Sequence, residues 1–148
     1  MNRFSRMTEL RKLQEEAAAL EVGRIQSRIA ELRQQADRMQ QETAQGRAEA
    51  LHDLPLSGQR LPPGLYEEYY EGQAWRLRQN EQHIRQEEEL LAKAMTAWSE
   101  ARVRMKQVER MEESEGKRLN VEEERREAKV RDDRSGARHA LALRTGGE

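Results

Sequence analysis

The sequence lacks most of what a compact enzyme or a membrane protein needs. It has no cysteine, which excludes disulfides and thiolate chemistry. Aromatic residues make up 4% and hydrophobic residues 35% of the chain, whereas a globular domain is nearly half apolar. No apolar run approaches the roughly 20 residues of a membrane span. Met1 to Leu20 is charged throughout and has no apolar centre, so we predict no secretory signal, no membrane insertion and a cytoplasmic protein.

An excess of one charge is also missing. The chain carries 27 basic and 28 acidic residues, for a net charge of −1. Nucleic-acid binding needs a basic excess or a clustered basic face, so we expect no nucleic-acid partner. His52, His83 and His139 are too far apart in sequence to form a local metal pair, and no phosphate-binding glycine motif is present. We therefore predict a protein with no cofactor and no metal, and not an enzyme.

Helix-forming residues dominate what remains, namely Ala, Glu, Leu, Arg and Gln. Proline occurs only at positions 55, 62 and 63. The residue before a proline disfavours the α conformation, and proline suits the first turn of a helix. This pattern predicts a first helix over about 4–53, a loop over 54–63 and a second helix over about 64–140.

Apolar residues at spacings of three and four mark both helices as coiled-coil arms. In the first arm, the run Leu10, Leu13, Ala17, Leu20 is out of phase with the run from Val22 to Thr43. We expect a register break between Leu20 and Val22, beside Gly23. The second arm has a strict seven-residue repeat from Tyr70. The predicted core residues are Ile25, Ile29, Leu32, Met39, Leu77, Ile84, Leu91, Trp98 and Met105.

The two apolar stripes have matching lengths, which favours pairing within one chain. If the hairpin closes around the loop, Phe4 faces roughly position 112, and the apolar stripe of the second arm ends at Met111. We predict one all-α domain, 1–148: a long, two-helix antiparallel coiled-coil hairpin with unequal arms, paired to about 111. A monomeric hairpin is expected, with a four-helix dimer as the alternative. Beyond 111 the chain is a charged extension with a frayed end over 141–148, and it is either a helical plug for another protein's cavity or a solvated tail.

Aromatic residues cluster at the start of the second arm: Tyr66, Tyr69, Tyr70 and Trp75. Tyr70 has two interpretations, as a cap on the hairpin core or as a partner contact. Exposed aromatics are enriched at protein interfaces, so we expect at least one of Tyr66, Tyr69 and Trp75 to bind a partner. Trp98 lies between small seam residues and is predicted to pack.

Several segments together resemble a known family. The opening Met1–Arg11, the stretch Leu61–Gln73, the stretch Ala94–Met105 with its Ala-x3-Trp pattern and the acidic-basic end with Asp132-Asp133 are similar to segments of type III export stalk proteins. These are the stalk proteins of the export ATPase in injectisomes and flagella, the FliJ-like family. The resemblance covers nearly the whole chain and leans toward an injectisome.

The resemblance implies a stalk at the cytoplasmic face of the secretion apparatus. One end would sit in the pore of a hexameric export ATPase, and the other would reach the cytoplasmic ring of the export gate; secretion chaperones are a further class of partner. The pore end would be the two termini, about Asn2–Lys12 and Glu112–Arg144, and the gate end would be the loop with its aromatic cluster. The representative pore residues are Arg3, Phe4, Arg6, Arg125, Arg126, Arg131, Arg134 and Arg138.

A generic coiled-coil adaptor or chaperone is the alternative function. Such a protein would hold clients through the aromatic loop end and would not need the charged extension. Substitution of Tyr66 and Tyr69 and deletion of the extension would therefore have opposite outcomes under the two hypotheses.

Overall fold

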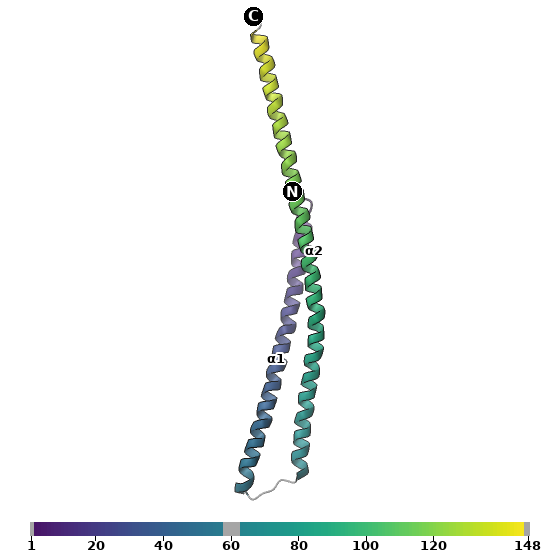
Figure 1. Ribbon diagram of the computed structural model, residues 1–148, viewed down its shortest axis with the longest axis vertical. Helices are drawn as coiled ribbons and strands as arrows, with labels where there is room; N and C mark the ends of the chain where they lie inside the picture. The colour runs from purple at the N-terminus through teal and green to yellow at the C-terminus, as the bar shows by residue number, and fades with distance from the viewer. Residues whose placement is uncertain (1, 58–62, 147–148) are drawn as a thin grey trace. The chain divides into compact units, whose positions relative to one another are not determined.

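The computed structural model describes residues 2–57 and 63–146, with side chains for residues 2–49 and 67–146. Two helices account for nearly all of these residues: α1, Ser5–Ser57, and α2, Pro63–Thr145 (Figure 1). The described ranges contain no β-strand. The prediction of an all-α helical hairpin is therefore confirmed, with arms of 53 and 83 residues. Neither helix has a stretch apolar enough to cross a membrane within these ranges.

The helix ends follow local chemistry that is only partly visible in the sequence. Asn2 caps α1, because its side-chain oxygen accepts a hydrogen bond from the Phe4 amide (3.0 Å) and its carbonyl accepts one from the Ser5 amide (3.2 Å). Pro63 begins α2, at the position where its missing N–H costs nothing. α1 continues past the expected end at 53 to Ser57, and α2 reaches Thr145 instead of ending near 140. A residue before a proline and a charged, glycine-containing segment both weaken a helix, but neither ends it at a fixed residue.

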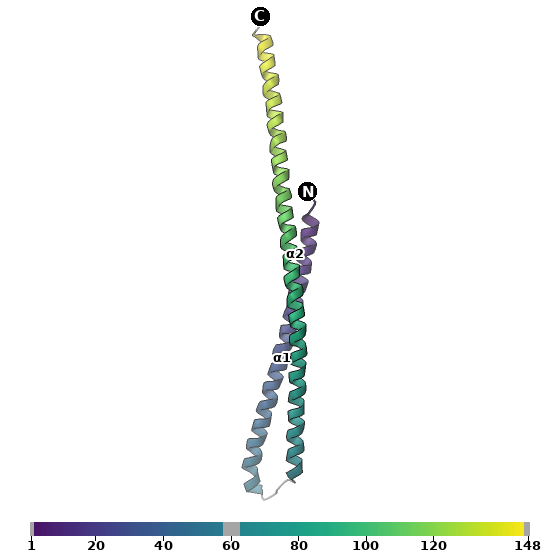
Figure 2. The ribbon, with the colours of Figure 1, turned by 45° about the vertical axis from the view of Figure 1, so that its right-hand side comes forward.

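The chain divides into two compact units. Unit 1 combines Met1–Gln14 with Ala101–Glu148, and unit 2 is Glu15–Glu100. In each unit α1 and α2 run side by side in opposite directions (Figures 1 and 2). Ion pairs that cross between the helices fit this direction: Arg33–Glu88 in unit 2 (3.2 Å) and Lys12–Glu109 in unit 1 (4.0 Å).

Burial is concentrated in the α1 seam of unit 2. Val22, Ile25 and Ile29 are 7%, 3% and 5% exposed. The other residues predicted for the core of unit 2 are half-buried: Leu32, Met39, Leu77, Ile84, Leu91 and Trp98. In unit 1, Met105 is half-buried as well. A two-stranded coil leaves part of each seam residue open to solvent, so half-burial of these residues is expected.

The expected register break in α1 is wrong. The seam keeps its three-and-four spacing from Val22 back through Glu15, Arg11 and Thr8 to Phe4, all of them buried or half-buried. An α-helix keeps its period, so the phase set by the strong run over 22–43 continues toward the N-terminus. The consequence is that Leu10, Leu13 and Leu20 are 53%, 64% and 67% exposed, and Ala17 is exposed as well. The apolar run assigned to the seam is therefore an outward face of α1.

Candidate partner-binding surfaces

The seam of unit 1 is closed by polar groups. Glu112 of α2 accepts two hydrogen bonds from the N-terminal segment: its carboxylate accepts one from the Ser5 hydroxyl (3.1 Å), and its backbone carbonyl accepts one from the Asn2 amide nitrogen (2.7 Å). Thr8 is 5% exposed, and its hydroxyl donates to the Phe4 carbonyl (3.0 Å). Short polar side chains thus occupy positions that carry isoleucine and leucine further along α1.

Glu115 is the second carboxylate of this seam and is only 8% exposed. Arg118 binds both of its oxygens, with Nη2–Oε1 at 2.7 Å and Nε–Oε2 at 3.1 Å. Arg3 approaches the same carboxylate at 3.7 Å, and Arg118 also reaches Glu122 at 2.7 Å. A bidentate arginine fixes the carboxylate more firmly than a single ion pair would.

These contacts favour the ionised carboxylates. The hydroxyl groups of Thr8 and Ser5 beside the carboxylate hold the pKa of Glu112 below its usual value of 4.5, and Lys12 adds a smaller Coulombic contribution. Hydrogen bonding to Arg118 lowers the pKa of Glu115, and the charges of Arg118 and Arg3 act in the same direction. The pKa of Arg118 is raised in turn by Glu115. Within this clasp between the N-terminal segment and α2, the contacts of Ser5 with Glu112 and of Arg3 with Glu115 are therefore strongest while the two carboxylates are charged, whereas the hydrogen bond from Asn2 to a backbone carbonyl does not depend on charge.

The outer face of the same N-terminal segment is apolar and basic. Met7, Leu10 and Leu13 are 46%, 53% and 64% exposed. Arg3 and Arg6 are exposed on the preceding turn. Sequence reasoning placed Leu10 and Leu13 in the seam and therefore missed them as surface residues. The signal that could have identified them is the continuous spacing of Val22 back to Phe4, which leaves no seam position for these leucines.

α2 continues beyond this clasp without α1 beside it (Figure 1). All residues from Glu123 to Gly146 are exposed. This extension carries every C-terminal arginine predicted for the pore end: Arg125, Arg126, Arg131, Arg134 and Arg138. Arg131 pairs with Glu127 within the helix at 3.9 Å, one of the i,i+4 pairs that favour an isolated helix. Of the N-terminal pore candidates, Arg3 and Arg6 are exposed, while Phe4 is half-buried with the Arg3 guanidinium 4.9 Å from its ring centre.

The aromatic cluster lies at the loop end of unit 2. Tyr69 and Tyr70 contact each other edge to face, with ring centres 5.5 Å apart. Tyr69 is 49% and Trp75 58% exposed, while Tyr70 is half-buried with the Arg47 guanidinium 4.5 Å from its ring centre. The side chain of Tyr66 lies outside the described residues. Tyr69 and Trp75 are therefore available to a partner, and Tyr70 belongs to the contact between the helices.

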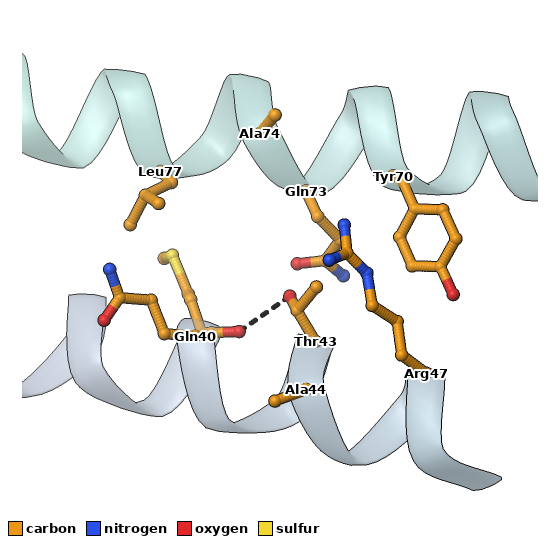
Figure 3. A pocket seen from close by; sticks show the side chains of 9 residues that line it. Gln40, Thr43, Ala44, Arg47, Tyr70, Gln73, Ala74 and Leu77 are labelled. Carbon is orange, nitrogen blue, oxygen red and sulfur yellow. Dashed lines mark hydrogen bonds between the residues drawn. The ribbon is translucent and has the colours of Figure 1, made fainter.

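A groove opens between α1 and α2 next to this cluster (Figure 3). Its volume is about 240 Å³, and Met39 and Leu77 line it from opposite helices. Arg47 extends from α1 toward α2, with its guanidinium between Gln73 and the Tyr70 ring (Figure 3). No sequence signal marked Arg47, because its role depends on which residue faces it across the hairpin.

No group of three or more His, Cys, Asp or Glu residues in residues 2–57 and 63–146 could hold a metal ion. The two surfaces described above, with their exposed apolar, aromatic and arginine side chains, are suited to binding other proteins.

Comparisons with known proteins give one family. No curated protein and no solved structure matches the chain. The family described as flagellar FliJ protein matches residues 1–144, nearly the entire sequence. A helical hairpin of unequal arms with two predicted partner-binding ends agrees with that match, and the chain belongs to the FliJ family.

Proposed function

We propose that this protein is a non-enzymatic central stalk of a type III export ATPase that links the ATPase to the export gate and supports protein secretion. The observation that carries the proposal is the match to the FliJ family over residues 1–144. Family membership supports a stalk role in flagellar and related type III export, together with an export ATPase and an export gate as the kinds of partner. An injectisome rather than a flagellum stays a prediction from the Met1–Arg11 opening and the Leu61–Gln73 stretch.

In this proposal the ATPase contact lies in unit 1. The exposed part of α2 from Glu123 to Thr145 is long, charged and free of α1, as a plug for a protein pore needs to be. The apolar face of Met7, Leu10 and Leu13 adds hydrophobic area beside Arg3 and Arg6. Exposed apolar side chains beside arginines suit a protein interface, where Met and Arg are enriched relative to the rest of the surface.

The gate contact lies at the loop end of unit 2. Tyr69 and Trp75 are the exposed aromatic anchors, with Tyr66 and Tyr70 as the remaining candidates of the cluster. Secretion chaperones are a further class of partner in the proposal, and the hairpin acts as a monomer at the cytoplasmic face of the export apparatus.

A truncation tests the ATPase contact. Deletion of residues 123–148 removes the unpaired helix but keeps Glu112, Glu115 and Arg118, so the clasp of unit 1 is preserved. We expect the truncated protein no longer to co-elute with the purified export ATPase of the same organism. It should also no longer change the oligomerisation or the ATP hydrolysis of that ATPase. A Tyr69→Ala, Trp75→Ala variant is the matched control, because it should keep both effects. ATPase binding that survives the truncation intact would show that the extension is not the pore contact.

The exposed Tyr69 and Trp75 also favour a second candidate, an adaptor that holds client proteins through its loop end. The two functions separate cleanly. A client adaptor should lose binding when Tyr66 and Tyr69 are both replaced by Ala, and should keep it when residues 123–148 are removed. The stalk should show the reverse pattern toward the ATPase.

A further inference from the structure

A line of apolar side chains runs along α2 through unit 1. Its members follow one another at intervals of eleven residues: Val108, Leu119, Val130 and Leu141. Eleven residues make about three helical turns, so these side chains lie on one face of α2, which we call the apolar line. Val108 is 6% exposed, and the other three are 38%, 48% and 61% exposed in that order. Only the first position of the apolar line is therefore covered.

The N-terminal segment, residues 2–14, covers this first position, and we call it the strap. Its Ser5 and Lys12 reach α2 at Glu112 (3.1 Å) and Glu109 (4.0 Å), the carboxylates that follow Val108. Among the side chains that the structure describes in unit 1, Val108 is the only strongly buried apolar one. Segments with few buried apolar contacts open at lower free energy than the rest of a protein. The strap is such a segment.

Both helices keep their own polar partners when the strap is away from α2. Arg118 of α2 binds both carboxylate oxygens of Glu115 at 2.7 and 3.1 Å, whereas Arg3 of the strap stays 3.7 Å away. In the strap, the Thr8 hydroxyl donates to the Phe4 carbonyl of the same helix. Separating two elements is costly when it leaves a charge buried without its partner. Glu115 keeps its closest partner, so opening of the strap avoids that cost.

The closed position of the strap is nevertheless well defined. The Asn2 amide nitrogen donates to the Glu112 carbonyl at 2.7 Å and lies 3.9 Å from the place that a Cβ of Gly116 would take. In an α-helix this carbonyl also accepts the amide of residue 116, so α2 does not need Asn2 to satisfy it. Gly116 thus gives Asn2 room to reach a carbonyl that α2 already uses. The strap has one closed position and can leave it.

We propose that the strap is an autoinhibitory segment: it opens as a unit, and while closed it keeps the α2 face around Val108 from the partner that binds the exposed remainder of the apolar line. The inference rests on the proposed function for the identity of that partner, the export ATPase. It adds a regulation to the ATPase contact, because closure of the strap and full engagement of α2 exclude each other. By thermodynamic reciprocity, ATPase binding opens the strap.

Cysteine labelling of the full-length chain tests the opening, because the parent sequence has no cysteine. Val108→Cys places a thiol under the strap, and Val22→Cys is the matched control in unit 2, where Val22 is 7% exposed. We expect iodoacetamide to alkylate Val108→Cys at least about ten-fold faster than Val22→Cys under native conditions. Equal rates at the two positions would show that the strap does not open by itself and would overturn the proposal.

A covalent lock tests the autoinhibition. Lys12→Cys, Glu109→Cys replaces an exposed ion pair of the strap, and a short bismaleimide links the two thiols. In calorimetric titration with the purified export ATPase of the same organism, the linked chain should bind about ten-fold more weakly than the same variant capped with N-ethylmaleimide. Arg33→Cys, Glu88→Cys is the matched control, because it replaces an exposed ion pair between the same helices in unit 2. Its link should not change binding.

An opening variant should have the opposite effect. Asn2→Ala, Ser5→Ala removes both hydrogen bonds from the strap to Glu112, so it should bind the ATPase about three- to ten-fold more tightly than the parent. Unchanged or weaker binding of this variant would contradict autoinhibition.

The outcomes separate the inference from the proposed function. If the parent chain binds the ATPase and the lock on the strap leaves the affinity unchanged, the autoinhibition is wrong and the stalk function stands. If both locks weaken binding equally, the loss is an effect of the link itself, and the autoinhibition is again wrong. If the parent chain does not bind the ATPase at all, the ATPase contact of the proposed function falls, and the autoinhibition falls with it.

Discussion

The seams of the two units are built from opposite chemistry. In unit 2, α1 turns Val22, Ile25 and Ile29 toward α2 and buries them almost completely. In unit 1, the buried residue of α1 is Thr8, whose side chain lies beside the carboxylate of Glu112 on α2. Burial of each large aliphatic side chain stabilises by about 1.5–3 kcal/mol, whereas exposed ion pairs contribute about 0–1 kcal/mol. Unit 2 is thus held together mainly by hydrophobic area, whereas unit 1 combines the buried Val108 with hydrogen bonds to charged groups.

The outer surfaces of the two units show the complementary difference. The helix face that unit 1 leaves to solvent includes Met7, Leu10 and Leu13, which a self-sufficient hairpin would have buried. Regions with few buried apolar contacts open at lower free energy than the rest of a protein. A unit that is weakly closed on itself and apolar outside is suited to a partner that covers it, whereas the seam of unit 2 supplies the rigid part of the hairpin.

Removing apolar area from the seam of unit 2 should have the largest effect on stability. Ile25→Ala deletes most of a side chain that is 3% exposed, and we expect it to lower the free energy of unfolding by about 2–4 kcal/mol. Urea denaturation followed by circular dichroism at 222 nm measures this. Leu13→Ala is the control, because Leu13 is 64% exposed in unit 1 and its truncation should change the free energy of unfolding by less than about 0.5 kcal/mol. Equal losses for the two variants would contradict the assignment of Ile25 to the seam and of Leu13 to the outer face of α1.

Asn80 is a buried polar residue in the otherwise apolar seam of unit 2, and its replacement should have the next largest effect on the free energy of unfolding. It is 5% exposed, and its side-chain oxygen has no hydrogen-bond partner among the described residues. Replacing a buried, incompletely satisfied amide with an apolar side chain removes a desolvation cost, so Asn80→Leu should raise the free energy of unfolding by about 1–2 kcal/mol. A buried seam asparagine also restricts register and oligomeric state. Sedimentation should therefore show more self-association for Asn80→Leu than for the parent protein. A less stable and strictly monomeric variant would show that Asn80 is satisfied in solution.

Periodicity and proline placement were enough to predict the fold. The run from Val22 to Thr43 and the repeat from Tyr70 fix two helices, and the prolines at 55, 62 and 63 fix the connection between them. The same reasoning located the aromatic loop end and the arginine-rich extension as the regions of interest. These features are local in the sequence, so they could be read without knowing which residues meet across the hairpin.

Features that depend on the opposite helix could not be predicted in this way. Leu10 and Leu13 look like seam residues because they are apolar and correctly spaced from each other, yet the phase of α1 is set by its stronger run further along. Thr8 is an unlikely seam residue until Glu112 is known to face it. Arg47 can be recognised as a contact between the helices only when the ring of Tyr70 is known to lie against its guanidinium. In each case the missing information is the partner side chain, which spacing within a single helix does not contain.

The smallest expected effect is a local change in unit 1, where the closure of the N-terminal segment should depend on pH. Glu112 and Glu115 have pKa values below 4.5 in the folded protein, lowered mainly by the hydroxyl of Thr8 and by Arg118 respectively. A carboxylate whose folded pKa is below its unfolded pKa contributes stability that is fully present above the unfolded pKa and is lost as the pH falls through the folded pKa. Amide hydrogen exchange in residues 5–14, corrected for the intrinsic pH dependence, should therefore become faster as the pH falls from 6 to below 4.5, while residues 22–32 in the hydrophobic seam stay protected.

The double variant Glu112→Gln, Glu115→Gln separates this clasp from a general acid effect. Without ionisable groups at these positions, residues 5–14 should already exchange faster at pH 6 and should show little further change as the pH falls. If the variant keeps the parent's pH profile, other carboxylates control the N-terminal segment. If the parent itself shows no change between pH 6 and pH 3, the hydrogen bonds of the clasp do not hold α1 to α2, and the apolar packing of Val108, 6% exposed, would have to do so alone. Unit 1 would then be held together by apolar packing, as unit 2 is, and its closure would not leave it open for a partner.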